Sequence, residues 1–430
     1  MKFKLKPIEK KWILYDIGNS AFALLISTII PIYFNYLAGD AGISEVNYLA
    51  YWGYATSAAT VIVAMLGPLL GTVSDAAGRK KKIFMIALLA GALGCVFLGF
   101  MQSWIWFLLL FVFAKSAYSL SLVIYDSMLT DITSEERMDE VSAQGYAWGY
   151  IGSCVPFICS LLLVLFYDKV GISMQTAMGI SFFLVAVWWI ALTVPLLKSY
   201  RQTHSRKPAV HAGQSGAQRL GQIVSELRKD KKVLFFLAAF FFYIDGVYTI
   251  IDMATAYGTA LGLDTTGLLL ALLLTQIVAF PAALLFGRIS RKVSASKLIL
   301  VCIFAYFLIA LYGIGLHRQY QFWILAVCVG CFQGAVQSMS RSYYAKIIPA
   351  EKSGEYFGIY DICGKGASFM GTILVSAVSQ ITGSVNLGVG ALSVMFLAGF
   401  FLFLKADKTE KSEEEQENPG VLFQQPGLGQ

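Results

Sequence analysis

The sequence has 430 residues, of which 57% are hydrophobic and only 14% are charged, with a formal net charge of +7. Soluble domains carry about 25% charged residues, so this composition excludes an ordinary soluble globular protein. Apolar runs of about 20 residues recur along the whole chain, and each is long enough to cross the ~30 Å hydrocarbon core of a bilayer. The sequence therefore predicts an all-α polytopic membrane protein.

The polar breaks between these runs divide the chain into twelve predicted transmembrane helices. Residues 1–11 are basic and no small-residue cleavage site follows the first apolar run, so we expect a retained helix rather than a signal peptide. In chain order the predicted spans are Trp12–Leu37, Tyr48–Ser74, Ile83–Met101, Trp104–Thr130, Val141–Tyr167, Met174–Leu197, Val233–Leu261, Thr266–Gly287, Leu298–Leu316, Phe322–Ala345, Tyr356–Ile381 and Val385–Leu404.

Positive charge gives the expected orientation, because cytoplasmic loops of membrane proteins are enriched in Lys and Arg. If both termini are inside, all but five of the 33 Lys and Arg residues fall in cytoplasmic segments. The exceptions are Lys169 and Arg318 outside, and Lys115, Arg341 and Lys365 within helices. We therefore expect both termini in the cytoplasm. The net positive charge then meets anionic lipid of the inner leaflet, and it does not indicate nucleic-acid binding.

The longest interior loop divides the predicted helices six and six. Residues 1–198 and 233–405 are expected to form two six-helix bundles, joined by a basic cytoplasmic linker at 199–232. The second part of this linker, QRLGQIVSELRKDKK, fits an amphipathic helix lying on the inner leaflet. Residues 406–430 are acidic and then rich in Gly, Pro and Gln, which predicts a disordered cytoplasmic tail. Within this tail, VLFQ resembles the remnant of a protease tag.

The two predicted halves are also similar in sequence. SMLTDITSEERMDEVSAQGYAWGYIGS, from Ser127, aligns without a gap with SYYAKIIPAEKSGEYFGIYDICGKGAS, from Ser342, at an offset of 215 residues. The alignment matches Glu140 with Glu355, and it places the fourth and fifth helices over the tenth and eleventh. Two equivalent halves around a central cavity permit alternating access, in which one half rocks against the other.

The loop between the second and third predicted helices carries a motif, GPLLGTVSDAAGRKKK, at residues 67–82. It resembles the cytoplasmic signature loop of the major facilitator superfamily, which implies that fold and a latch on its inner gate. Gly71 permits close approach of two helices, and Gly78 permits a turn with positive φ. Asp75 fits a cap on the positive N-terminus of a helix from the opposite half. Arg79 and the lysines that follow it are expected to lie at the lipid headgroups.

The corresponding loop of the second half is FGRISRKVSASK. It keeps the first glycine of the motif as Gly287, but Arg291 stands where the aspartate would be. This half of the motif is therefore degenerate.

Three further motifs resemble the vacuole-effluxer-like family within this superfamily. They are YDIGNSAFA at Tyr15–Ala23, YIDGVYTII at Tyr243–Ile251 and the segment from Ser340 to Gly371 that contains EKSGEYFGIYDICGKGASFMG. Fungal members of that family release amino acids from the vacuole, while many bacterial members have no known substrate. The resemblance covers all twelve spans, and it implies an amino-acid-like substrate and a monomeric protein in the plasma membrane of a bacterial-type cell.

Charged and polar residues near the bilayer midplane are functional candidates, because an ionised side chain there costs roughly 2.5–3.5 kcal/mol on insertion scales. Depth along the predicted helices selects Lys115, Asp245, Lys365, Gln276 and Gln333. We expect Lys115 or Lys365 to bind the carboxylate of a zwitterion across a central cavity from Asp245, which takes the ammonium group. The alternative is a structural ion-pair network that holds the two halves in register.

A second set of charges lies nearer the cytoplasm. Asp16, Asp126 and Asp361 lie within two turns of the predicted inner ends of their helices, and Arg341 occupies the position equivalent to Asp126. We expect Asp126 and Arg341 to pair when the inner gate closes and to part when it opens. Asp361 and Lys365, four residues apart, could instead neutralise each other.

The sequence therefore predicts a secondary active transporter of a small polar solute, an amino acid or a similar zwitterion. Asp16, Asp126 and Asp245 are eligible for proton coupling if burial raises their pKa values, whereas facilitated uniport or exchange is the alternative. A lysolipid, amphiphile or drug transporter of the same fold is the rival function. The sequence shows no metal-ligand cluster, no Ser with a His base and no phosphate-binding loop, so we expect neither an enzyme nor a cofactor.

Overall fold

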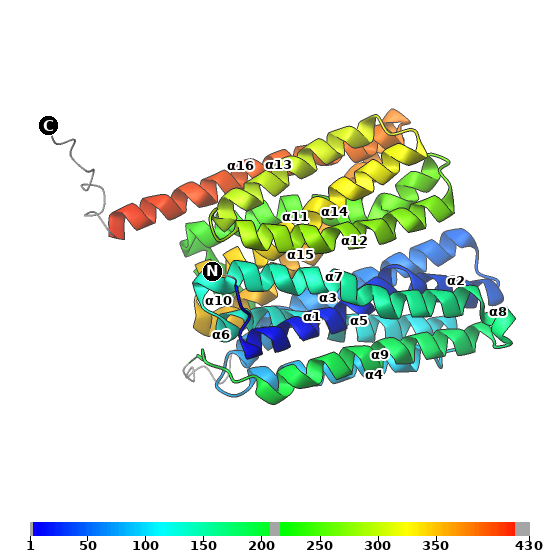
Figure 1. Ribbon diagram of the computed structural model, residues 1–430, viewed down its shortest axis with the longest axis horizontal. Helices are drawn as coiled ribbons and strands as arrows, with labels where there is room; N and C mark the ends of the chain where they lie inside the picture. The colour runs from blue at the N-terminus through cyan, green and yellow to red at the C-terminus, as the bar shows by residue number, and fades with distance from the viewer. Residues whose placement is uncertain (1–2, 207–215, 418–430) are drawn as a thin grey trace.

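The computed structural model describes residues 3–206 and 216–417, and these fold almost entirely into α helices (Figure 1). The helices form two groups, each packed mainly within itself. The first group comprises α1 (Pro7–Ser27), α2 (Ile29–Asp40), α3 (Glu45–Ser74), α4 (Lys80–Leu98), α5 (Trp104–Ser127), α6 (Leu129–Ile132), α7 (Glu135–Leu165), α8 (Tyr167–Val170) and α9 (Met174–Ser199).

The second group follows a short helix in the linker, α10 (Gly216–Lys229). It comprises α11 (Lys231–Ala260), α12 (Thr265–Ile289), α13 (Ala295–Ile314), α14 (Gln319–Ile347), the 3₁₀ helix η1 (Ala350–Lys352), α15 (Ser353–Thr382) and α16 (Val385–Glu417). Eleven stretches within the described residues are long and apolar enough to cross a membrane. The predicted span Tyr356–Ile381 lies in α15, and because the side chains of residues 365–369 lie outside the described part, a total of twelve crossings stays a prediction.

Local sequence explains where several helices begin and bend. Asp230 and Asp264 accept hydrogen bonds from main-chain N–H groups three residues further on, and thereby cap α11 and α12. The first predicted span is interrupted at Thr28, between α1 and α2. Pro31 accounts for this break, because its ring has no N–H and collides with the carbonyl four residues earlier, at Ser27.

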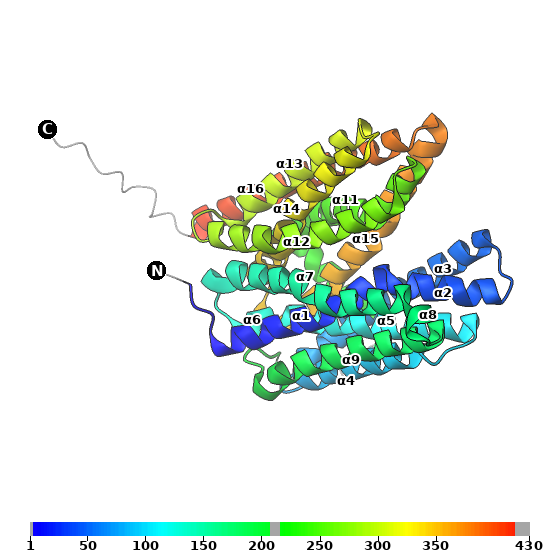
Figure 2. The ribbon, with the colours of Figure 1, turned by 45° about the vertical axis from the view of Figure 1, so that its right-hand side comes forward.

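Both ends of the described chain lie at one end of the bundle, here called the terminus end; the opposite end is called the far end (Figure 1). The two groups pack against each other along α3 and α15 and along α7 and α12. They diverge toward the far end (Figure 2). The fold therefore brings the two groups together at the terminus end and separates them at the far end.

Two expectations about the linker and the tail are wrong. The amphipathic helix forms as α10, but its apolar residues Ile223 and Leu227 are buried in the protein core instead of lying on a leaflet. They lie four residues apart on one helix face, which α3 and α11 cover. The tail is helical as far as Glu417, because its Glu and Lys residues are good helix formers and extend a helix already nucleated by α16. Residues 418–430 lie outside the described part.

Candidate functional site

The closest approach of the two groups is a contact between α3 and α15, here called the first seam. A Cβ atom built on Gly354 would lie 2.6 Å from the Gly71 carbonyl oxygen and 2.8 Å from Asp75 Oδ1. One on Gly358 would lie 2.5 Å from the main-chain nitrogen of Pro68. Side chains at these glycines would force the helices apart. The structure therefore requires Gly71 for close helix packing, as the sequence predicts.

Asp75 caps the N-terminus of α15 across the first seam. Its Oδ1 accepts a hydrogen bond from the Gly354 N–H at 2.8 Å, and its Oδ2 accepts one from the Glu355 N–H at 3.0 Å. These N–H groups have no partner within their own helix and carry the positive end of its dipole. Burial raises the pKa of the Asp75 carboxyl to about 6. The expected cap from the opposite half is present.

The basic residues of this loop do not all reach the surface. Gly78 has the expected positive φ, 72°, and Arg79 is exposed. Lys80, however, is fully buried, and its Nζ lies 2.9 Å from Ser353 Oγ and 3.3 Å from Asp131 Oδ2. The expectation that every lysine here lies at the headgroups is wrong for Lys80, because the turn at Gly78 directs α4 back over the start of α15.

A second seam joins α7 and α12. A Cβ on Gly287 would lie 2.7 Å from Ala143 Cβ, so these two helices also need a small residue where they cross. One turn further along, Arg291 donates two hydrogen bonds to the carboxylate of Glu140. Arg291 stands in the position of Asp75, and Glu140 is the equivalent of Glu355. The degenerate motif therefore closes its seam with an ion pair in place of a helix cap.

Between the two seams, Arg341 of α14 is the centre of a buried charged cluster. Its Nη2 lies 3.2 Å from Asp16 Oδ2 on α1, and its Nη1 lies 3.0 Å from Asp126 Oδ1 on α5. Its Nε donates to Ser142 Oγ at 3.0 Å, and only 2% of the Arg341 residue surface is exposed. The expected pair of Asp126 and Arg341 is formed in this state, with Asp16 as a second acid.

Aromatic rings complete the surroundings of the guanidinium. Arg341 lies 4.6 Å from the ring centre of Trp12 and 4.3 Å from that of Tyr146, distances at which cation–π attraction is appreciable. A Cβ on Gly145 would lie 3.0 Å from Arg341 Nη2, so the glycine leaves room for the side chain. The cluster therefore contains two acids, Asp16 and Asp126, and one base, Arg341.

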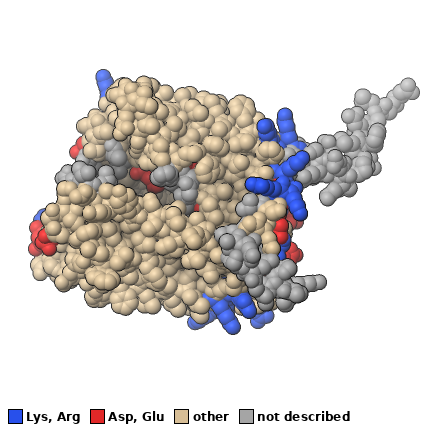
Figure 3. All heavy atoms as spheres, turned by 180° about the vertical axis from the view of Figure 1, so that it is seen from behind, with Lys and Arg blue, Asp and Glu red and all other residues tan. Residues whose placement is uncertain are grey.

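A hollow opens between the two groups toward the far end, and Figure 3 shows acidic atoms inside it, while most basic side chains gather at the terminus end. Lys115 of α5 is half-buried, and Asp252 of α11 is exposed. The two are close enough for Lys115 to act electrostatically on Asp252, although they belong to different groups. Tyr248, one turn before Asp252, lies within electrostatic reach of Asp126 and Asp361. Lys115 and Asp252 thus bring charges of opposite sign, one from each group of helices, within electrostatic reach of each other.

Asp245 does not face this hollow, and the predicted opposition of Lys115 and Asp245 across water is wrong. Asp245 is fully buried inside the second group. Its Oδ2 accepts the Gly371 N–H at 2.8 Å, and its Oδ1 accepts the Thr249 hydroxyl at 3.2 Å. Asp252 is two turns further along the same helix face, where the groups have diverged. Depth along a helix did not reveal that α15 covers Asp245.

The remaining predicted residues are divided among several environments. Gln333 is 2% exposed, and its Nε2 has no hydrogen-bond partner among the described residues. Gln276 is half-buried on α12. Asp361 is half-buried on α15 within electrostatic reach of Asp126. The side chain of Lys365 lies outside the described residues, so its place in the cavity and its pairing with Asp361 stay predictions.

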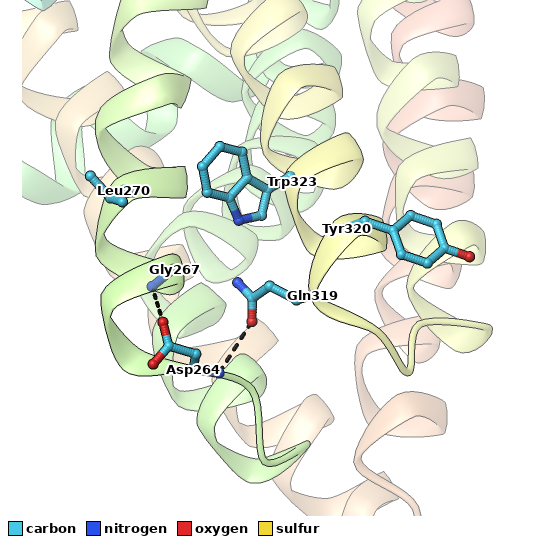
Figure 4. Close-up of a pocket in the computed structure, with 6 residues that line it drawn as sticks. All are labelled: Asp264, Gly267, Leu270, Gln319, Tyr320 and Trp323. Carbon is cyan, nitrogen blue, oxygen red and sulfur yellow. Dashed lines mark hydrogen bonds between the residues drawn. The ribbon is translucent and has the colours of Figure 1, made fainter.

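Another groove lies at the far end between α12 and α14 (Figure 4). Its polar groups serve the helix ends: Asp264 Oδ2 accepts the Gly267 N–H at 2.7 Å, and Gln319 Oε1 accepts the Asp264 N–H at 3.1 Å. Leu270 and Trp323 make the rest of its lining apolar. Because this groove lacks the paired charges of the central hollow, we regard the central hollow as the candidate site.

The profile of the family described as "Vacuole effluxer Atg22 like" matches residues 6–417. YxiO of Bacillus subtilis, an uncharacterized MFS-type transporter, is 38% identical over 416 residues, which cover 95% of this chain and 97% of that protein. Autophagy-related protein 22-1 of Penicillium rubens is 26% identical over 293 residues, which are 62% of this chain and 49% of the fungal protein.

Solved structures of major facilitator transporters share the fold. FucP in its outward conformation has a TM-score of 0.70 at 12% identity, with 93% of this chain and 97% of FucP covered. A bacterial homologue of the iron transporter ferroportin in its outward-facing state has a TM-score of 0.67 at 14% identity, with 94% of this chain and 100% of that chain covered. At these identities the likeness concerns the fold alone.

Proposed function

Because the chain belongs to the vacuole effluxer Atg22-like family of major facilitator transporters, we propose that it moves a small zwitterion, an amino acid or a similar solute, by alternating access. The observation that carries the proposal is a pair of opposite charges, Lys115 and Asp252, that belong to different groups of helices and act on each other electrostatically. Lys115 offers an ammonium group to a carboxylate, and Asp252 offers a carboxylate to an ammonium group. Asp252 thereby takes the role that the sequence favoured for Asp245.

The terminus end is proposed to face the cytoplasm of a bacterial-type cell. Most basic side chains gather there (Figure 3), as expected for the inner side of a membrane protein. In this orientation the two seams form a closed inner gate, and the hollow opens outward. Transport then requires both seams and the Arg341 cluster to separate while the far end closes, with the two groups of helices moving as halves.

The cluster around Arg341 is proposed to couple this movement to protons. Two carboxylates, that of the buried Asp16 and that of the half-buried Asp126, share one guanidinium, so the three side chains carry one excess negative charge when all are ionised. One proton bound by the cluster would neutralise this excess charge, which is costly away from water. Separation of the halves would hydrate the carboxylates and release that proton to the cytoplasm. Proton coupling of this kind predicts uptake that depends on a pH gradient.

Thermal stabilisation of the purified protein tests the proposed substrate class. A ligand that binds only the folded state at 100 times its Kd stabilises that state by about 2.7 kcal/mol. The panel comprises the twenty amino acids, dipeptides, lysolipids and sugars, applied to the wild type, Lys115→Gln and Asp252→Asn. Asp40→Asn and Lys169→Gln are matched controls, because both residues are exposed near the far end.

An amino acid that stabilises the wild type and both controls, but neither cavity variant, supports the proposed site. Stabilisation by lysolipids or hydrophobic cations alone would favour the rival amphiphile or drug transporter. If an amino acid stabilises Lys115→Gln and Asp252→Asn as strongly as the wild type, these two residues are not its ligands. Uptake into proteoliposomes with and without a pH gradient then separates proton coupling from facilitated transport.

A further inference from the structure

The linker between the two groups of helices runs directly over the first seam. The Arg206 N–H donates to the Asp75 carbonyl at 2.8 Å, and Gln202 Nε2 donates to the carbonyls of Ser74 and Asp75 at 3.3 Å. Nearby, the main-chain N–H groups of Thr203 and His204 donate to Asp131 Oδ1 at 3.1 and 2.8 Å. The start of the linker is therefore bound to the signature loop through Gln202 and Arg206, and to Asp131 of α6 through Thr203 and His204.

From this position the side chain of Arg206 crosses to the second group. Its Nη1 lies 3.2 Å from Glu355 Oε2 in the first turn of α15. The Glu355 side chain is fully buried, whereas the Arg206 side chain is 23% exposed. Thr72 on α3 donates to the same Glu355 oxygen at 2.7 Å. Arg206 thus binds the signature loop through its main chain and the opposite group through its side chain.

The internal symmetry of the chain shows what this contact replaces. Glu355 is equivalent to Glu140, and Glu140 is paired with Arg291 from the loop of its own seam. The position equivalent to Arg291 is Asp75, which is an acid and places a second negative charge beside Glu355. The first seam therefore has a helix cap at the position where the second seam has an arginine.

We propose that the linker is a working part of the terminus-end gate, and that Arg206 supplies to the first seam the positive charge that Arg291 supplies to the second. Each acid of the first seam then has a cation: Lys80 lies 3.8 Å from Asp75, and Arg206 lies 3.2 Å from Glu355. Because Arg206 joins the two groups, the linker must release Glu355 whenever the gate opens. Arg206 acts on transport as a positioning residue.

The second part of the linker strengthens this arrangement. Helix α10 is held against α3 and α11 through the buried side chains of Ile223 and Leu227. On the same helix, Glu226 pairs with Lys352 at 2.7 Å, directly before the first turn of α15. The linker is thus bound close to Glu355 from both sides, and opening the gate must disturb both contacts.

The test measures the distance between the two groups at the terminus end. Lys81 and Lys292 are exposed and belong to different groups, so both are replaced by spin-labelled cysteine after the seven native cysteines have been removed. Distance distributions are recorded for the wild type, Arg206→Glu, Arg206→Lys and Arg201→Glu. Arg201 is an exposed linker residue and gives a matched charge reversal away from the seam. Gel filtration and melting temperature check that every variant is folded.

Arg206→Glu is expected to raise the ratio of separated to closed molecules by about 3- to 10-fold, as expected for a partly exposed charge-assisted pair that becomes repulsive. Arg206→Lys should stay close to the wild type, and Arg201→Glu should not differ from it. The inference is overturned if Arg206→Glu matches Arg201→Glu, or if Arg206→Lys opens the gate as much as Arg206→Glu.

The inference rests on the proposed alternating access, and the same experiment distinguishes the two. A wild type with a single distance under all conditions would contradict alternating access itself. In that case the linker inference is still decided by whether Arg206→Glu produces the longer distance. A wild type with two distances whose ratio does not respond to Arg206→Glu would contradict the linker inference alone.

Discussion

Arg341→Ala removes the single base of the buried cluster and leaves two carboxylates facing each other between the halves. Arg341 is 2% exposed and bonds to Asp16, Asp126 and Ser142 in the closed gate. Removing one partner of a buried ion pair costs about 3–5 kcal/mol, because the remaining charge stays out of water. In a separated state both carboxylates are hydrated and escape that cost. The ratio of separated to closed molecules should rise by roughly 160- to 5,000-fold.

Asp126→Asn should raise the ratio of separated to closed molecules much less than Arg341→Ala does, although it removes the 3.0 Å ion pair between Arg341 and Asp126. It leaves Arg341 paired with Asp16, and this pair is neutral as a whole. Arg341→Lys should lie between the two variants, because a lysine keeps the charge but cannot bond to both acids through a planar fork. The distances between labels at residues 81 and 292 report all three. A closed gate in Arg341→Ala, or equal opening in Arg341→Ala and Asp126→Asn, would refute this reasoning.

Three further changes test the seams and the buried acid. Gly354→Ala should destabilise the closed state by about 1–3 kcal/mol, the range for overpacking, and so open the gate. Gly53→Ala is the control, because Gly53 has free space around it, and it should leave the distance between the labels at residues 81 and 292 unchanged. The pKa of Asp75 is about 6 in the closed state and has its ordinary lower value when hydrated, so the closed state gains stability as pH falls through 6 and loses it as pH rises. The population of the closed state relative to the open state should increase about tenfold from pH 7.5 to 5. If Asp75→Asn keeps this pH response in full, the Asp75 carboxyl is not the source of the response. Asp245→Ala should lower the free energy of unfolding by about 1–3 kcal/mol, because it removes the acceptor of the buried Gly371 N–H, and it should leave ligand affinity unchanged. A loss of ligand affinity without a loss of stability would show that Asp245 belongs to the binding site.

The sequence predicted the structure best at positions where the residue type itself indicates a specific structural role. A glycine between two apolar helices and an aspartate four residues later predict close packing and a helix cap, and Gly71 and Asp75 provide both. The pairing of Asp126 with Arg341 followed from the internal repeat, since equivalent positions of two halves face each other across a pseudo-two-fold axis. The family resemblance is confirmed over nearly the whole chain.

Sequence was least informative where the environment comes from a distant segment. Asp245 and Asp252 occupy the same helix face, and only the covering by α15 and the divergence of the halves separate a buried acid from an exposed one. Lys80 is one of four consecutive cations, and its burial depends on Asp131 and Ser353. The mismatch between the two loop motifs could have indicated that Glu355 is contacted by a cation from outside the loop, which in the structure is Arg206.

Uptake of radiolabelled amino acids into proteoliposomes tests most directly whether the central hollow transports a zwitterion. The wild type is expected to accumulate at least one amino acid faster than empty liposomes. Lys115→Gln and Asp252→Asn should lose most of that uptake, while Asp40→Asn and Lys169→Gln keep it. Absence of amino-acid uptake by a folded wild type that transports lysolipids or hydrophobic cations would contradict the account, as would full uptake by both cavity variants.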